Sequence, residues 1–267
     1  MLLQVENVYK SYSKSCGIIK KEKLQVLKGV SFKLHRSECL GIIGESGSGK
    51  STLGRLIIGV EKPDNGNIFI NNTNINSSRG KSIKKDVSVV FQDYFSSVNP
   101  RFKIIDIISE PIRVYEKLSK KDTTLKIINL LERVGLSKKF LSRYPHELSG
   151  GQLQRVCIAR AIATKPKFIV LDEAISSLDV SIQVQILDLL KELKNDIDIS
   201  YIFITHDLTA VTYICDRVIF FHDGNIVEQV DNIEDLKNVK NDYSKNLLQA
   251  ATQMNVREAI YENQRVS

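Results

Sequence analysis

The chain contains the stretch Gly44-Glu45-Ser46-Gly47-Ser48-Gly49-Lys50-Ser51, and this stretch decides its fold. It fits the pattern G-x-x-x-x-G-K-[ST], in which glycines let the backbone turn its N–H groups toward phosphate oxygens. A short apolar run, residues 40–43, precedes it, and a segment with helical character, residues 51–60, follows. A strand, a phosphate-binding loop and a helix in this order predict an α/β fold.

Buried strands that alternate with helices along the rest of the chain favour a mostly parallel sheet wrapped by helices. Strands are expected at residues 67–70, 87–91, 168–171 and 201–205, helices at 150–164 and 182–194, and a two-stranded turn at 218–227. Alternating apolar residues at 2–8 and 30–34 predict an antiparallel part, with the basic segment 13–25 as a loop between its strands. Apolar residues at helical spacing indicate an inserted helical subdomain at 93–144; they are Leu125, Ile128, Leu131 and Val134.

Composition excludes several classes of protein. With 42% hydrophobic and 26% charged residues over 267 positions, the chain is neither disordered nor collagen-like. It has no apolar run of membrane-spanning length and no signal-peptide pattern, so a cytosolic protein is expected. The net charge of +7 comes from lysines spread along the chain, which favours a solvated surface over a nucleic-acid partner. Four scattered cysteines without a CxxC pair are expected to be reduced and buried: Cys16, Cys39, Cys157 and Cys215.

Two carboxylates, Asp172 and Glu173, end the buried strand at 168–171. Acids at that position are costly unless they face a metal or a polar cleft. Asp172 is placed to hold the shell of a Mg²⁺ ion that Ser51 also ligates, while Lys50 contacts phosphates. Glu173 could act as general base toward a water in line with the γ-phosphate. The alternative is that both acids cap the following turn.

His206 and Gln92 also follow predicted strands, so they should return to the same edge of the sheet. His206 is predicted to donate to the γ-phosphate, although an isolated histidine is more often structural. Gln92 could reach Mg²⁺ or water without adding charge.

The segment Leu148-Ser149-Gly150-Gly151-Gln152 opens a predicted helix and forms a second anion site. Because the chain already has one phosphate-binding loop, two half-sites imply two chains. The phosphate loop, Gln92, this segment, the Asp172-Glu173 strand, Ser177-Leu178-Asp179 and His206, in that order, resemble the ATP-binding subunit of an ABC transporter. The resemblance covers about residues 1–230.

That resemblance implies an ABC ATPase fold of the P-loop NTPase class, with ATP and Mg²⁺ as ligands. Its catalytic residues would be Glu173, His206, Lys50 and Gln92, and its metal ligands Ser51, Gln92 and Asp172. Nucleotide contacts would come from Tyr12, Gly44, Glu45, Ser46, Gly47, Ser48, Gly49, Lys50, Ser51 and Thr52, and in trans from Ser149, Gly150, Gly151 and Gln152. Tyr12 is the candidate for stacking on adenine, with Tyr9 near enough to compete and core packing as the alternative for both.

The resemblance also implies an organisation and a set of partners. The ATP-binding core is expected at residues 1–92 and 145–230, a helical subdomain that contacts the permease at 93–144, and a C-terminal extension at 231–267. The partners would be a second ATPase subunit, two membrane permeases and a solute-binding protein outside the membrane, with no nucleic acid. The chain would lie peripherally at the cytoplasmic face. A soluble ABC ATPase acting on nucleic acid or ribosomes is a remote alternative.

Within the family, residues 91–101 and 178–185 resemble the peptide and nickel importers. Leu153, Val156, Cys157 and Ala174 resemble the nickel-import branch more narrowly, so nickel is the first expected cargo and a peptide or chelated metal the second. Two departures are Tyr94, where a proline is common, and residues 241–248, which only loosely echo a C-terminal His-Pro-Tyr-Thr segment. The cysteine cluster of some partner ATPases is absent, which makes this chain the cluster-free member of an expected heterodimer.

Overall fold

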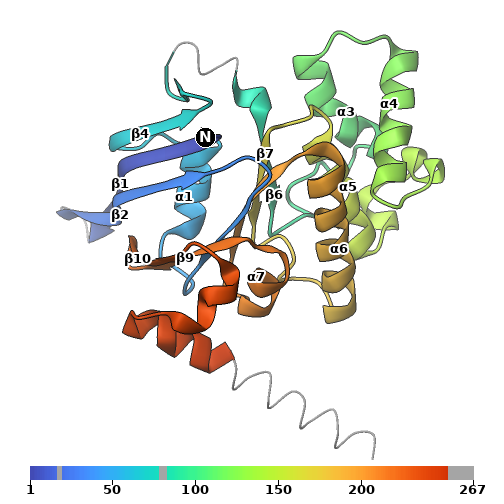
Figure 1. The fold of residues 1–267 in the computed structure, drawn as a ribbon. Coiled ribbons are helices and arrows are strands. Elements are labelled where there is room, and N and C mark those ends of the chain that lie inside the picture. The colour runs from blue at the N-terminus through green and yellow to red at the C-terminus, as the bar shows by residue number, and fades with distance from the viewer. Residues whose placement is uncertain (17–19, 78–82, 252–267) are drawn as a thin grey trace, which may run out of the picture.

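The structure is a computed structural model that describes residues 1–16, 20–77 and 83–251, without the side chains of residues 14–16 and 20–22. It contains two sheets with helices between and around them (Figure 1). The expected burial of Cys39, Cys157 and Cys215 as free thiols is confirmed. The side chain of Cys16 lies outside the described part.

The core sheet has the strand order β10-β9-β3-β8-β7-β6. All its neighbours pair in parallel except β10, which pairs antiparallel with β9. Its strands are β3 (Cys39–Ile43), β6 (Val87–Phe91), β7 (Phe168–Asp172), β8 (Ser200–Thr205), β9 (Arg217–His222) and β10 (Asn225–Val230). Every residue of β3 and β8 is buried, because helices or the second sheet cover both faces of a parallel sheet.

The second sheet is antiparallel and has the order β2-β1-β4-β5, as the sequence predicts for its N-terminal part. Its strands are β1 (Leu3–Cys16), β2 (Lys20–Leu34), β4 (Asn65–Ile70) and β5 (Thr73–Asn74). The prediction of a loop at residues 13–25 is wrong, because β1 and β2 continue as a paired hairpin from Tyr12↔Leu24 to Cys16↔Lys20. Ser13 and residues 23–25 are exposed, so this part of the hairpin has no buried face to reveal it in the sequence.

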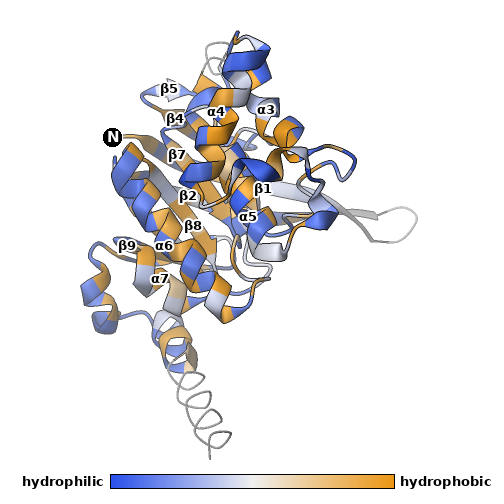
Figure 2. Ribbon diagram, turned by 90° about the vertical axis from the view of Figure 1, so that its right-hand side faces the viewer, coloured by the Kyte–Doolittle hydropathy of each residue, from blue (hydrophilic) through white to orange (hydrophobic). Residues whose placement is uncertain are grey.

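Two hydrophobic clusters lie on opposite faces of the core sheet. One joins that sheet to the antiparallel sheet and to α1 (Lys50–Ile57). The other joins it to α5 (Gly150–Ile162), α6 (Val180–Ile197) and α7 (Leu208–Ile214). Figure 2 shows α6 and α7 with hydrophilic and hydrophobic residues alternating along them, and hydrophobic strands behind. The result is the layered α/β architecture that the sequence predicts, with α7 as an unpredicted addition.

The region expected to be helical contains α3 (Ile104–Tyr115) and α4 (Lys120–Arg133). Ser119 caps α4 by accepting a hydrogen bond from the backbone N–H of Asp122. The predicted apolar stripe is only partly right, since Leu131 and Val134 are buried and Ile128 is half-buried, whereas Leu125 is exposed. Leu125 therefore lies on the outer face of α4.

Beyond β10, the chain forms a 3₁₀ helix, η4 (Ile233–Asn238), and then a helix over residues 242–251. Three of the partly buried side chains that pack against the larger cluster belong to this last helix: Leu247, Leu248 and Ala251. The C-terminal extension is thus packed onto the core as far as residue 251. Among the helices of the described residues, none combines the length and the apolar character that crossing a bilayer requires.

The antiparallel sheet depends on a close backbone contact at Gly66 in β4. A Cβ atom at this position would lie 2.2 Å from the carbonyl oxygen of Asn7, and Gly66 has φ +88°. Asn7 sits where the pairing of β1 with β4 shifts register, between Glu6 and Tyr9. Only glycine lets the two strands meet there.

We expect Gly66→Ala to lower the free energy of unfolding by about 1–3 kcal/mol more than Gly135→Ala. Both glycines have positive φ, but the nearest atom to a Cβ at Gly135 is the end of the flexible Arg155 side chain, at 3.2 Å. Comparison of the two variants therefore separates the energetic cost of the clash with the Asn7 backbone from the cost of placing alanine at a positive φ. Urea unfolding measures the difference, and equal losses in the two variants would contradict the role given to the close contact.

Candidate functional site

The carboxyl ends of strands β3, β6, β7 and β8 meet along one edge of the core sheet. A cavity of about 430 Å³ opens at this edge. It is lined by Val26, Ser46, Gly47, Gly49, Lys50, Ser51, Thr52, Gln92, Glu173 and His206. Residues expected to bind nucleotide or to act in catalysis thus come together from four separate parts of the chain.

The phosphate loop connects β3 to α1 and curves tightly. Gly47 has φ +81° and Gly49 φ +108°, which residues with a side chain rarely adopt. At Gly44 a Cβ atom would lie 2.0 Å from the carbonyl oxygen of Phe221, so the loop begins against the end of β9. The carbonyl of Ser48 accepts a hydrogen bond from the Gly224 N–H, 3.0 Å away. The turn between β9 and β10 therefore packs against the phosphate loop and is hydrogen-bonded to it.

Lys50 is the first residue of α1 and is 5% exposed. Its ammonium group donates to the carbonyls of Gly44 at 2.6 Å and Glu45 at 2.7 Å. Burial lowers the pKa of Lys50, while the carboxylates of Glu173 and Asp172 oppose that shift. The charged head group therefore lies folded over the phosphate loop, inside the cavity where phosphates would sit.

Ser51 and Asp172 form the pair expected to bind the metal. The Ser51 hydroxyl donates to Asp172 Oδ1 over 3.0 Å, which joins the start of α1 to the end of β7. Burial raises the pKa of Asp172, and the hydrogen bond from Ser51 counteracts the shift. Hydroxyl and carboxylate oxygens are ligands that Mg²⁺ prefers, so the donors present here fit that ion.

Glu173 and His206 lie next to each other because β7 and β8 are neighbouring parallel strands. His206 Nδ1 is 3.0 Å from the Glu173 carboxylate, and the side chain of Glu173 is 14% exposed. Glu173 Oε2 is buried and lies 3.0 Å from His206 Nδ1, as Oε1 does. Glu173 also has φ +51°, a strained conformation for a residue with a side chain. The carboxylate therefore lines the cavity beside the phosphate loop with His206 next to both of its oxygens. Its role as general base stays a prediction.

Gln92 follows β6 and lines the same cavity. Its side-chain Nε2 donates to the Ser176 hydroxyl over 3.4 Å, and its backbone carbonyl accepts from the Ser177 hydroxyl over 3.5 Å. These contacts connect Gln92 to the turn that follows Glu173. Its roles toward Mg²⁺ and water stay predictions.

Ser149 and Gln152 form a reciprocal cap at the start of α5 and do not line the cavity. A Cβ at Gly150 would lie 2.6 Å from the Tyr94 hydroxyl, and one at Gly151 would lie 2.7 Å from Ile182 Cγ2. Both glycines therefore permit close packing at the start of α5. The predicted nucleotide contact of these residues in trans stays a prediction.

Tyr12, expected to stack on adenine, is not among the residues that line the cavity. Its hydroxyl donates to Glu61, and its ring lies 5.5 Å from the ammonium group of Lys10. Val26 lines the cavity instead, and sequence reasoning did not identify it. The adenine contact of Tyr12 stays a prediction.

Tyr243 is a second residue near the site that the sequence analysis missed. Its hydroxyl accepts the backbone N–H of Glu45 at 3.0 Å, and its ring lies 4.1 Å from that of His222. Burial raises the pKa of Tyr243. Tyr243 and Ser244 correspond to the Tyr-Thr of the C-terminal His-Pro-Tyr-Thr segment that residues 241–248 loosely resemble. This resemblance is the one signal in the sequence that could have pointed to Tyr243. Through Tyr243, the helix at 242–251 contacts the phosphate loop.

A phosphate loop, an acidic strand end and a histidine around one cavity define a P-loop nucleoside triphosphatase. Residues 27–176 match the family described as ABC transporter. The metal-staphylopine import system ATP-binding protein CntF of Staphylococcus aureus (strain NCTC 8325 / PS 47) is 44% identical over 93% of this chain and 98% of its own length. The oligopeptide transport ATP-binding protein OppF of Haemophilus influenzae is 42% identical over 94% of this chain and 78% of its own length. The chain belongs to the ABC transporter family.

Solved structures agree with this assignment. The dimeric post-hydrolysis structure of the ATP-binding cassette MJ0796, bound to ADP and Pi, has a TM-score of 0.76 and 29% identity over 85% of this chain and 97% of that chain. The cbiO1 structure from Clostridium perfringens, part of a cbiONQ transporter complex, has a TM-score of 0.77 and 30% identity over 89% of this chain and 90% of that chain. The predicted ABC ATPase fold is confirmed.

The chain is accordingly the ATPase subunit of an ABC importer, and it binds ATP with Mg²⁺. Homologous importer ATPases work with membrane permease subunits and substrate-binding proteins. The chain is a peripheral subunit at the cytoplasmic face of the membrane.

We expect Tyr243→Phe to raise the KM for ATP about fivefold and to change kcat less than twofold. The variant keeps the ring contact with His222 but loses an acceptor for the phosphate loop, and one such hydrogen bond contributes about 1 kcal/mol. Steady-state ATPase assays of the assembled transporter measure both constants. Tyr213→Phe, which removes a hydroxyl bonded to Asp188 on the surface, is the matched control. An unchanged KM, or the same shift in the control, would exclude a role for Tyr243 at the loop.

Proposed function

We propose that Glu173 is the general base of ATP hydrolysis in this chain. The observation that carries the proposal is the position of the Glu173 carboxylate, which lines the same cavity as Lys50 and Ser51 and lies beside His206. A base must lie within hydrogen-bond reach of the water it activates, and a carboxylate in the wall of the phosphate cavity is placed for that contact. His206, 3.0 Å from this carboxylate, orients it and donates to the γ-phosphate.

The other residues hold the substrate. When ATP binds, the Lys50 ammonium group leaves the carbonyls of Gly44 and Glu45 and donates to the β- and γ-phosphates. Its positive charge there offsets the negative charge of the phosphates. Ser51 and Asp172 would hold Mg²⁺, and the bound ion would neutralise part of the phosphate charge. Gln92 positions water or metal from the end of β6. Glu173 then takes the proton of the attacking water as it bonds to the γ-phosphorus, and ADP leaves with the bridging oxygen.

We further infer that a second ATPase subunit completes the site, with Ser149, Gly150 and Gly151 acting in trans. These residues do not line the cavity of their own chain, yet they present a helix N-terminus that attracts anions. The similarity to a dimeric cassette supports this arrangement. The helical region 93–144 would receive the permease. ATP binding would close the dimer and hydrolysis would reopen it, which drives transport mechanically.

We expect Glu173→Gln to lower ATP turnover by ~10²–10⁴-fold and to leave Mg-ATP binding intact. The substitution keeps the shape of the side chain and its hydrogen bond to His206 but removes the base. With the partner subunit and ATP, the variant should accumulate as a dimer in size-exclusion chromatography. Lys50→Ala is the matched control, and it should neither bind ATP nor dimerise. Near wild-type turnover in Glu173→Gln would transfer the proposed role to His206.

We propose nickel, free or as a chelate, as the transported solute. Support comes from the resemblance of Leu153, Val156, Cys157 and Ala174 to nickel-import ATPases, and from the 44% identity to a protein of a metal-staphylopine import system. The solute does not contact this chain, so these residues indicate the transport system rather than a binding site. Peptide import is the second candidate, because OppF and DppF of Haemophilus influenzae are 42% and 39% identical.

We expect deletion of the gene to reduce uptake of radioactive nickel and the activity of nickel-dependent enzymes where the cell has them. Complementation with the wild-type gene should restore uptake, whereas the Glu173→Gln gene should not. Uptake of a labelled dipeptide, measured in the same strains, is the parallel assay. Unchanged nickel uptake together with a loss of peptide uptake would replace the nickel proposal with the peptide one.

A further inference from the structure

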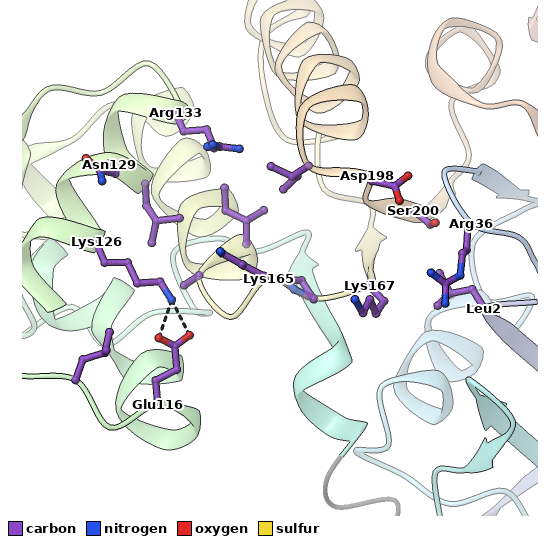
Figure 3. Close-up of a pocket in the computed structure, with 16 residues that line it drawn as sticks. Leu2, Arg36, Glu116, Lys126, Asn129, Arg133, Lys165, Lys167, Asp198 and Ser200 are labelled. Carbon is purple, nitrogen blue, oxygen red and sulfur yellow. Dashed lines mark hydrogen bonds and ion pairs between the residues drawn. The ribbon is translucent and has the colours of Figure 1, made fainter. Parts of the chain in front are cut away.

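A second cavity, of about 860 Å³, lies at the edge of the core sheet opposite the nucleotide cavity (Figure 3). Lys167 directly precedes β7 and Ser200 opens β8, so the cavity faces the amino ends of these strands. Its other wall comes from α4 and the residues before it, including Glu116 and Arg133. The volume falls within the range of ~300–1,000 Å³ that small-molecule sites occupy.

The floor of this cavity is apolar. Buried side chains from two parts of the chain form its centre, and two half-buried ones extend it. The buried residues are Leu2, Ile162, Ala163 and Pro166, and the half-buried ones are Leu130 and Ile197. The floor can therefore take up the hydrophobic part of a ligand.

The rim carries more cations than anions, with five lysine and arginine side chains against two carboxylates. Among the interactions of the described residues, no ion pair or side-chain hydrogen bond involves the lining cations Arg36, Arg133, Lys165 and Lys167. Lys126 differs, because Glu116 neutralises it at 2.6 and 2.8 Å. The remaining lining acid, Asp198, accepts a hydrogen bond from the Ser37 hydroxyl. Cations gathered around one cavity repel each other, and an anion placed between them relieves that repulsion.

Helix dipoles explain part of this arrangement. The C-terminal ends of α4, α5 and α6 lie at the cavity, and their partial negative charge favours nearby cations such as Arg133 and Lys165. The helix dipoles do not explain the presence of Arg36 and Lys167, because these residues precede the strands β3 and β7 rather than end a helix.

Two lining residues, Lys165 and Asp198, lie in the left-handed region of the backbone. Lys165 has φ +52° and Asp198 φ +53°, at the ends of α5 and α6. Glycine or asparagine usually takes such positions, because other side chains cost about 1 kcal/mol there. The chain keeps a lysine and an aspartate at these positions, so their side chains project from strained backbone into the lining of one cavity.

We propose that this cavity binds an organic anion in which a phosphate or carboxylate group is joined to a short apolar body. The anionic group would lie among Lys165, Lys167 and Arg133, and the apolar body would cover Ile162 and Pro166. Such a ligand joins the helical region to the core sheet. The same chemistry is found in free phosphate esters and carboxylates and in anionic lipids.

Isothermal titration of the purified full chain with octyl phosphate tests the proposal, with ADP at saturation to keep the probe out of the phosphate loop. Inorganic phosphate carries the charge without the apolar body, and 1-octanol carries the body without the charge. We expect each of these two to bind at least tenfold more weakly than octyl phosphate. Equal affinity for octanol, or no binding of octyl phosphate at millimolar concentration, would overturn the proposal.

Variants locate the site. We expect Lys165→Gly to weaken octyl phosphate binding at least fivefold without lowering the melting temperature, because glycine relieves the strained φ while the charge is lost. Lys167→Gln should weaken it similarly. Lys121→Gln, an exposed lysine of α4 outside the cavity lining, should leave binding unchanged. Wild-type affinity in both cavity variants would contradict the assignment.

Vesicles distinguish the two sources of the ligand. Competition with octyl phosphate by vesicles that contain phosphatidylglycerol, abolished by Lys165→Gly, would assign the site to an anionic lipid. Absence of competition would assign it to a free anion.

Discussion

The parallel register of β6, β7, β8 and β3 is the constraint on which the nucleotide site depends. Asp172 pairs with Phe91 on one side and with Ile204 on the other, and Ile43 pairs with Thr205. These pairs bring four strand ends to one level of the sheet, so the residues that follow them share one cavity. Chemistry that needs a phosphate loop, a metal ligand, a base and a histidine within a few ångströms of each other follows from this single alignment.

The phosphate loop is also held from outside the strand-loop-helix unit that contains it. Gly44 begins the loop against the carbonyl of Phe221, Ser48 accepts from Gly224, and Glu45 donates to Tyr243. These contacts come from the last third of the chain, beyond the residues that match the family description. A loop whose glycines permit many conformations is thereby restricted to one, which reduces the conformational entropy that ligand binding must remove.

The two cavities occupy opposite ends of the same strands and differ in what fills them. At the carboxyl ends, carboxylates and a buried lysine balance each other's charge, and the site suits a nucleotide with its metal. At the amino ends, unpaired cations surround an apolar floor. Both cavities contact the helical region or the residues that lead into it, through Gln92 at one end and α4 at the other.

Local sequence patterns were sufficient to predict the α/β class, the phosphate loop, the strand that ends in Asp172 and the meeting of Gln92, Glu173 and His206, because motif spacing and strand polarity act over short stretches. The paired hairpin at residues 13–25, the packing of Tyr243 and Val26 near the loop, and the position of Tyr12 on Glu61 escaped prediction. Each of these is decided by contacts between segments far apart in the chain, or by a strand without a buried face, and neither leaves a periodic pattern. Which residues finally touch the phosphate loop was therefore decided by tertiary packing, since only the folded chain brings residue 26 beside residue 49 and residue 243 beside residue 45.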